Sequence, residues 1–123
     1  MLQPIRILTV DDSASMRALL RHALTGNGFD VVQAEDGVAA LEWLAGNEVD
    51  VVITDINMPK LDGYGVIQHI RERPEYDDLP ILVLTTESDQ DKKERARKLG
   101  ATGFIIKPFN PTGLVDVLRK VAA

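Results

Sequence analysis

The segment PILVLT, residues 80–85, decides the fold, because it holds four consecutive apolar side chains between a proline and a threonine. A strand that is apolar at every position is buried on both faces, and such strands lie at the centre of parallel sheets covered by helices. Residues 51–53, Val-Val-Ile, show the same pattern. With three similar runs, the predicted strands are Ile5–Val10, Asp30–Ala34, Val49–Thr54, Pro80–Thr85 and Thr102–Lys107.

A helical pattern of apolar side chains follows each predicted strand. These patterns cover residues 16–24, 37–45, 64–70, 89–99 and 111–121. Asp36 and Asn110 stand directly before two of them and are the predicted N-caps. Each strand is therefore followed by a helix that can cross over the sheet.

The fourth predicted helix, residues 89–99, is more polar than the others. Its sequence DQDKKERARKL offers only Ala96 and Leu99 to a core. Ser88 is expected to cap its start, with the acidic residues Asp89 and Asp91 after it. We expect this helix to be loosely packed and to provide a face that a partner can use.

Five repeats of a strand and a helix predict an α/β fold, a doubly wound five-stranded parallel sheet flanked by five helices. The expected strand order is 2-1-3-4-5, as in flavodoxin-like folds. In such sheets, ligands bind at the carboxyl ends of the strands, where the strand order reverses. The site is therefore expected beside the ends of the first and third strands.

Composition excludes several classes of function. The chain of 123 residues fits one domain, has no Cys and carries a net charge of −5. Without Cys there are no disulfides, thiolate zinc sites or Cys nucleophiles, which suits the reducing cytoplasm. The negative charge disfavours a nucleic-acid partner. No apolar run is long enough for a membrane span, and no secretory signal is visible, so we expect a cytoplasmic protein.

Charged and polar side chains stand at the ends of four predicted strands. They are Asp11, Asp12, Asp55, Thr85, Thr86 and Lys107. Three carboxylates that converge without thiols are typical ligands of a hard dication, and Mg²⁺ fits best. A lysine and a hydroxyl beside such an ion suit phosphoryl transfer, with a carboxylate as the nucleophile and an acyl phosphate as the product.

The segments around these residues resemble the receiver domains of bacterial two-component response regulators. The resemblance rests on VDDSASMR (residues 10–17), TDINMPKLDG (54–63), LTTESD (84–89) and GATGFIIKPF (100–109). It covers nearly the whole chain and is nearest to the single-domain chemotaxis (CheY-like) receivers. The resemblance implies a phosphorylation-activated signalling switch over residues 1–123. Such a protein is no enzyme beyond its own phosphotransfer and autodephosphorylation.

The resemblance also implies a role for each residue of the site. Asp55 is the expected phosphoacceptor, assisted by the Thr85 hydroxyl and by the phosphate-pairing Lys107. The expected Mg²⁺ ligands are Asp11, Asp12, Asp55 and the backbone carbonyl of Asn57. Asp12 would bind the ion directly and Asp11 largely through water.

Four positions are expected to tune the switch. Asn57 and Glu87 resemble the polar residues of receivers that lose phosphate quickly. Phe104 stands where chemotaxis receivers usually carry a Tyr, so a partner contact through that hydroxyl is not expected to be retained. Thr86 is bulkier than the Ala often found there and would narrow the space into which the Phe104 ring turns. The Lys107–Pro108 peptide is expected to be cis, by the same resemblance.

The resemblance implies a sensor histidine kinase (CheA-like) as the phosphoryl donor. The chain ends shortly after the last predicted helix, so we expect no output domain and a monomer that signals by protein–protein contact. One expected target is the flagellar motor switch, which the Ser15-Met16-Arg17 segment and the Asn57/Glu87 pair favour. The alternative is a phosphorelay intermediate that passes phosphate to a histidine phosphotransfer protein.

A different class with the same architecture is a flavodoxin-like FMN-binding protein. That function needs an uncharged loop after the first strand to hold the FMN phosphate. The loop here contains Asp11 and Asp12, whose charges would repel the phosphate. The FMN alternative is therefore disfavoured.

Overall fold

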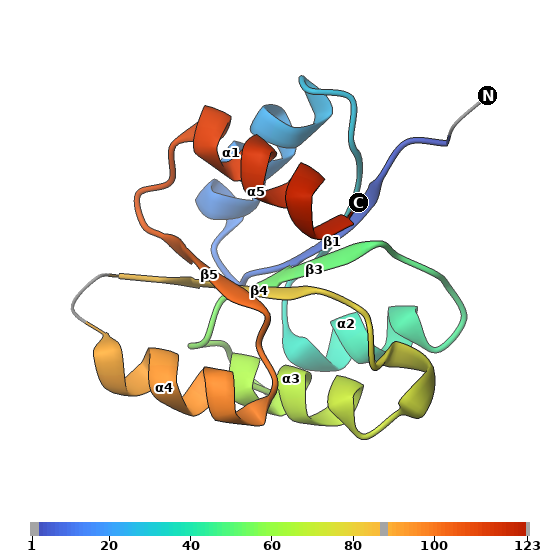
Figure 1. The fold of residues 1–123 in the computed structure, drawn as a ribbon, viewed down its shortest axis with the longest axis vertical. Helices are drawn as coiled ribbons and strands as arrows, with labels where there is room; N and C mark the ends of the chain where they lie inside the picture. The colour runs from blue at the N-terminus through green and yellow to red at the C-terminus, as the bar shows by residue number, and fades with distance from the viewer. Residues whose placement is uncertain (1–2, 87–88, 123) are drawn as a thin grey trace.

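The computed structural model describes residues 3–86 and 89–122. A central parallel sheet lies between two layers of helices (Figure 1). In chain order the elements are β1 (Arg6–Val10), α1 (Ala14–Thr25), β2 (Asp30–Ala34), α2 (Gly37–Leu44), β3 (Val51–Thr54), α3 (Gly63–Arg71), the 3₁₀ turn η1 (Pro74–Tyr76), β4 (Ile81–Thr85), α4 (Gln90–Leu99), β5 (Gly103–Ile106) and α5 (Pro111–Ala122). Among the described helices, none combines the length and the apolar character needed to cross a bilayer.

The strands are all parallel and follow the order β2-β1-β3-β4-β5, which confirms the predicted doubly wound sheet. Val10 of β1 pairs in register with Thr54 of β3, and Thr54 pairs with Val83 of β4. The carboxyl ends of these strands therefore meet at one edge. Several strands are a residue or two shorter than predicted; β4, for example, begins after Pro80, which has no N–H for the ladder.

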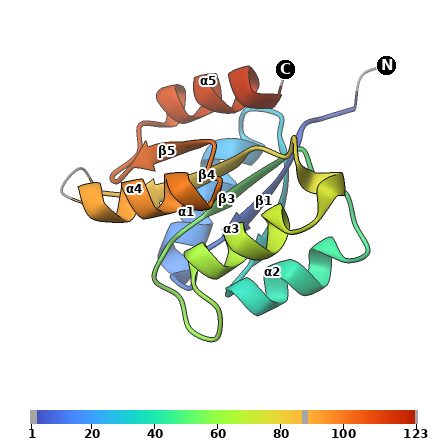
Figure 2. The same ribbon diagram turned by 60° about the horizontal axis from the view of Figure 1, so that its bottom comes forward.

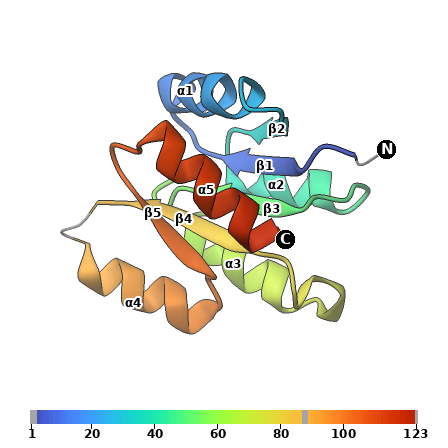
Figure 3. The ribbon, with the colours of Figure 1, turned by 45° about the horizontal axis from the view of Figure 1, so that its top comes forward.

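Two apolar clusters fill the space on either side of the sheet. Along β4, Ile81 and Val83 face the cluster under α2, α3 and α4, whereas Leu82 and Leu84 face the cluster under α1 and α5. These four side chains are at most 1% exposed, as the all-apolar pattern predicts. Figure 2 shows α2, α3 and α4 in a row on one face, and Figure 3 shows α1 and α5 on the other.

Side-chain caps explain where most of the helices begin. Ser13, Asp36 and Asp62 each accept a hydrogen bond from the backbone N–H three residues further on, at the starts of α1, α2 and α3. Asn110 accepts the N–H of Gly113 at the start of α5. Such caps satisfy amide donors that have no partner within the helix. The predicted caps Asp36 and Asn110 are thus confirmed.

The start of α4 differs from the prediction. Its N-cap is Asp89, and the Asp89 side chain makes no capping hydrogen bond with the helix. Asp89 thus precedes the helix and is not its first residue as predicted, whereas Asp91 lies in the first turn; the predicted cap Ser88 lies outside the described residues. Ala96 is fully buried and Leu99 packs at the edge of the core, as predicted.

Candidate functional site

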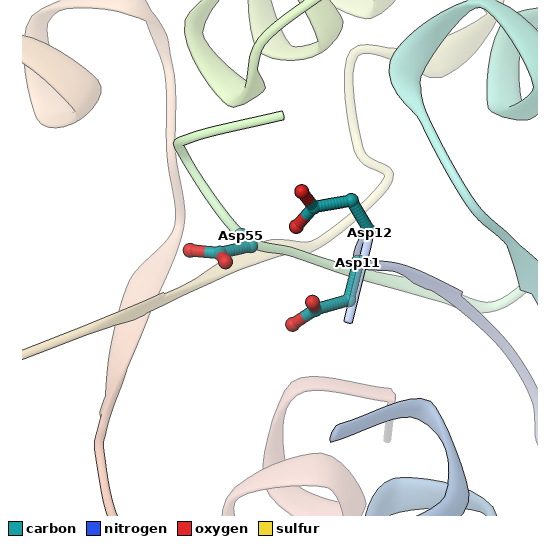
Figure 4. A group of neighbouring side chains, drawn as sticks. All are labelled: Asp11, Asp12 and Asp55. Carbon is teal, nitrogen blue, oxygen red and sulfur yellow. The ribbon is translucent and has the colours of Figure 1, made fainter. Parts of the chain in front are cut away.

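Three carboxylates converge at the carboxyl ends of β1 and β3 (Figure 4). Asp11 and Asp12 directly follow β1, and Asp55 directly follows β3. Because Val10 and Thr54 pair in the sheet, the residues that follow them emerge side by side. One carboxylate oxygen of each Asp lies within 4.8 Å of the other two. The sheet register therefore creates the acidic cluster.

Asp11 is the buried member of this cluster, with 1% of its surface exposed. Its Oδ1 accepts the backbone N–H of Ser13 at 2.8 Å, but its Oδ2 has no hydrogen-bond partner among the described residues. Burial raises the pKa of Asp11, and the charges of Asp55 and Asp12 raise it further, although the Ser13 N–H and Lys107 oppose this. A buried carboxylate oxygen without a donor is costly, and a cation is the group it lacks.

Asp55 is held by one backbone donor and one cation. Its Oδ1 accepts the N–H of Ile56 at 2.7 Å, and its Oδ2 lies 3.2 Å from Nζ of Lys107. Lys107 follows β5, so this ion pair reaches across the end of β4. The Asp55 side chain is only 15% exposed, but Asp55 lines a cleft. The backbone thus orients the carboxylate, and the lysine marks where a further anion can be bound.

Gly63 presses the loop after β3 against the backbone of Asp55. A Cβ at this position would lie 2.2 Å from the carbonyl oxygen of Asp55 and 2.8 Å from Cα of Ile56. The Gly63 N–H donates to the Ile56 carbonyl at 2.8 Å, which fixes the same contact. Only glycine fits so close to another backbone. The start of α3 is therefore packed directly on the residue that carries the Asp55 carboxylate.

The cleft beside Asp55 has a volume of about 140 Å³ and collects side chains from several elements. It is lined by Asp55, Ile56, Asn57, Leu84, Thr85, Thr86, Asp89, Lys92 and Lys107. The sequence pointed to most of the polar members, but Asp89 and Lys92 were not expected there. The sequence feature that could have identified Asp89 and Lys92 is their position in the segment that directly follows Thr85 and begins the next helix.

Asp89 binds the two threonines at the end of β4. Its Oδ2 accepts the Thr86 hydroxyl at 2.7 Å and lies 3.3 Å from the hydroxyl oxygen of Thr85. The bond from Thr86, with smaller contributions from the charge of Lys92 and from Thr85, holds the pKa of Asp89 below its usual range. The Asp89 carboxylate is therefore a strong acceptor within reach of the cleft. The expected tuning residue Glu87 lies outside the described residues.

Phe104 does not line this cleft. It is partly buried on β5, packs against the core and lies in a shallow groove between β5 and α5. The guanidinium of Arg97 lies over its ring, 5.6 Å from the centroid. The Lys107–Pro108 peptide is cis, in agreement with the resemblance.

The atoms of the acidic cluster that could bind a metal are all carboxylate oxygens. Their chemistry fits Mg²⁺. Two adjacent carboxylates and a third across the sheet provide the kind of ligand that Mg²⁺ prefers. The buried Oδ2 of Asp11, which accepts no hydrogen bond from the described residues, is suited to bind a cation. With Lys107 beside Asp55, the arrangement can hold a dication and a phosphoryl group together.

Residues 7–119 match the family of response regulator receiver domains. The chain is 40% identical over 119 residues to a chemotaxis protein CheY homolog of Campylobacter jejuni, which covers 95% of this chain and 92% of that protein. It superposes on the chemotaxis response regulator CheY4 of Vibrio cholerae with a TM-score of 0.90 and 39% identity, covering 97% and 99% of the two chains. A more distant structure is the receiver domain of the sensor histidine kinase PA1611 from Pseudomonas aeruginosa, solved with a magnesium ion in its active-site cleft. Its TM-score is 0.89 at 26% identity, covering 97% and 98%.

Proposed function

The chain belongs to the family of response regulator receiver domains, and from this premise we propose that it is a switch activated by phosphorylation of Asp55. The observation that carries the proposal is the Asp55 carboxylate, which lies between an acidic pair and the Lys107 ammonium. A nucleophile with a cation on one side and a pair of potential metal-binding carboxylates on the other suits attack on a phosphoryl group.

Mg²⁺ is the proposed cofactor, held by Asp11, Asp12, Asp55 and the backbone carbonyl of Asn57. The buried Asp11 oxygen, which has no donor in the described part of the chain, supports this ligand set, and the magnesium in the PA1611 receiver supports the choice of ion. When bound, Mg²⁺ supplies positive charge that offsets the charge on the transferring phosphoryl oxygens.

In the proposed reaction, Oδ2 of Asp55 attacks the phosphorus of a phosphohistidine. The new O–P bond forms while the N–P bond breaks, and the histidine ring nitrogen takes the bonding electron pair. The Ile56 N–H orients the carboxylate through Oδ1, and Lys107 pairs with a phosphoryl oxygen. The Thr85 hydroxyl then turns to donate to another phosphoryl oxygen. Attack of water on the phosphorus restores Asp55, at a rate that Asn57 and Glu87 are proposed to set.

The proposed donor is a sensor histidine kinase (CheA-like), and the proposed output is contact with a protein such as the flagellar motor switch. The likeness to two chemotaxis receivers supports this assignment. The second candidate is a phosphorelay intermediate, since the similar PA1611 receiver belongs to a histidine kinase. Because histidine kinases use ATP, which is found in the cytoplasm, we propose that the protein works in that compartment. We also propose that it is a monomer.

Labelling of the purified protein tests the central proposal. The wild type should take up phosphate from acetyl phosphate only when Mg²⁺ is present, and Asp55→Asn should abolish this uptake, because an amide cannot form the acyl phosphate. Asp116→Asn, which removes an exposed charge from α5, is the matched control and should label normally. Labelling of Asp55→Asn at the wild-type level would refute the assignment.

The lifetime of the phosphorylated protein separates the two candidate roles. A lifetime of seconds would support chemotaxis, because a motor must follow rapidly changing signals. A lifetime of hours, with transfer to a histidine phosphotransfer protein, would support the phosphorelay instead.

A further inference from the structure

The N-cap of α4 does not use its side chain as the other N-caps do. In α1, α2 and α3 the N-cap side chain closes its own helix. Asp89 has the right chemistry for the same bond, yet its carboxylate makes no capping bond to α4. Instead, its Oδ2 accepts the hydroxyl of Thr86 and lies in bonding distance of the hydroxyl of Thr85. The carboxylate is therefore directed back toward the end of β4.

The hydroxyl of Thr85 carries one proton and can donate only one full hydrogen bond at a time. Among the described residues, it has an acceptor in the Asp89 carboxylate at 3.3 Å and another in the Thr86 carbonyl at 3.4 Å. The charged carboxylate is the stronger acceptor. Thr85 is only 4% exposed, so water offers little competition. In this state the hydroxyl is directed at Asp89.

Asp89, Thr85 and Asp55 all line the same small cleft. A phosphoryl group on Asp55 would place new acceptor oxygens in this cleft and would add negative charge beside the Asp89 carboxylate. Two anions would then compete for the proton of one hydroxyl and would also repel each other. Phosphorylation must therefore overcome the bond between Asp89 and Thr85.

We propose that Asp89 is a positioning residue that holds the Thr85 hydroxyl away from Asp55 and so sets the equilibrium between the unphosphorylated and the phosphorylated arrangement. This inference rests on the proposed function and adds to it a residue that opposes the switch. By mass action, weakening the bond raises the population of the arrangement that accepts the phosphoryl group. Asp89 acts through Thr85 and does not touch the reacting atoms.

The test uses beryllofluoride, a phosphoryl mimic that binds a carboxylate, together with Mg²⁺. Asp89→Asn keeps the size of the side chain but removes its charge, so the hydrogen bond to Thr85 becomes weaker. We expect the dissociation constant for beryllofluoride to fall about five- to tenfold, because the bond to Thr85 changes from a charge-assisted to a weaker neutral hydrogen bond. Asp91→Asn is the matched control, because it removes an exposed charge from the first turn of the same helix, and should change the constant less than twofold.

A double-mutant cycle separates this role from a general effect of charge or of helix stability. In a Thr85→Ala background, Asp89→Asn should give a clearly smaller gain, because the hydroxyl that it would release is absent and only the charge repulsion is relieved. An equal gain in both backgrounds would overturn the inference, and so would an Asp89→Asn protein that binds like the wild type. These failures differ from failure of the proposed function, in which the wild type itself would take up no phosphate on Asp55.

Discussion

Replacing Asp11 by Asn is expected to raise the free energy of unfolding of the metal-free protein. It is also expected to reduce the stability that Mg²⁺ binding adds. The buried Oδ2 of Asp11 has no donor among the described residues, and two further carboxylates lie close by. An Asn side chain keeps an oxygen for the Ser13 N–H but carries no charge. The substitution therefore removes the buried negative charge for which the described residues supply no hydrogen-bond donor at Oδ2.

The magnitude follows from the geometry. At 4.8 Å, two unit charges repel by about 3.5 kcal/mol at an effective dielectric constant of 20. The Lys107 ammonium and the Ser13 N–H offset much of this repulsion, so we expect a net gain of about 1–2 kcal/mol. For 123 residues, each kcal/mol corresponds to about 4 °C in Tm, so the variant should melt about 4–8 °C higher.

The pH dependence has a definite sign. The pKa of Asp11 is raised in the folded state, mainly by burial, so folding disfavours the charged form. The wild type therefore loses stability as the pH rises through this pKa, and the variant does not. The advantage of Asp11→Asn should be largest near neutral pH and should shrink as the pH falls through the raised pKa.

Thermal unfolding followed by circular dichroism, with EDTA or with MgCl₂ at matched ionic strength, measures both effects. At a Mg²⁺ concentration of 100 times Kd, the wild type should gain about 2.7 kcal/mol, and Asp11→Asn should gain clearly less. Asp116→Asn, an exposed change on α5, should follow the wild type in both buffers. An Asp11→Asn protein that is less stable than the wild type in EDTA would refute the reasoning.

Two further predictions concern the loop after β3. Gly63→Ala should lower the free energy of unfolding by about 2–3 kcal/mol and slow labelling of Asp55, because the new Cβ would overlap the Asp55 carbonyl. Urea unfolding and acetyl phosphate labelling measure these two effects. Gly46→Ala is the control, because a Cβ at position 46 meets no atom within 4 Å. Lys60 has a φ of 68°, which Asn tolerates better than Lys. Lys60→Asn should therefore stabilise by about 0.5 kcal/mol in urea unfolding, although it removes the 3.6 Å ion pair between the exposed Lys60 ammonium and the buried Asp36 carboxylate; a lower urea midpoint would contradict this.

The sheet was predictable because its evidence is local. Four apolar residues in a row at 81–84 indicate a strand buried on both faces, and the alternation of strands and helices then restricts the topology to few choices. The convergence of Asp11, Asp12 and Asp55 followed from the same reasoning, since the ends of parallel strands meet at one edge. Neither prediction required knowledge of how any side chain is oriented.

The features that sequence reasoning missed all depend on tertiary contacts. The sequence places Asp89 at the acidic start of a helix, but it does not show that the carboxylate turns away from α4 toward the hydroxyls of Thr85 and Thr86. The position of Lys92 in the cleft depends on where α4 docks. The need for glycine at position 63 comes from the carbonyl of Asp55, which lies close only in the folded chain.

The shallow attachment of α4 has a consequence for how such proteins can diverge. Of its residues, all within the described part of the chain, Ala96 is the buried one, so most substitutions along this helix cost little folding free energy. The acidic cluster and Lys107 belong to other elements, and changes in α4 leave them intact. Because Lys92 of α4 lines the cleft, duplicated copies in one genome can diverge at the cleft through substitutions on this one surface helix, while every copy keeps the same carboxylates and Lys107.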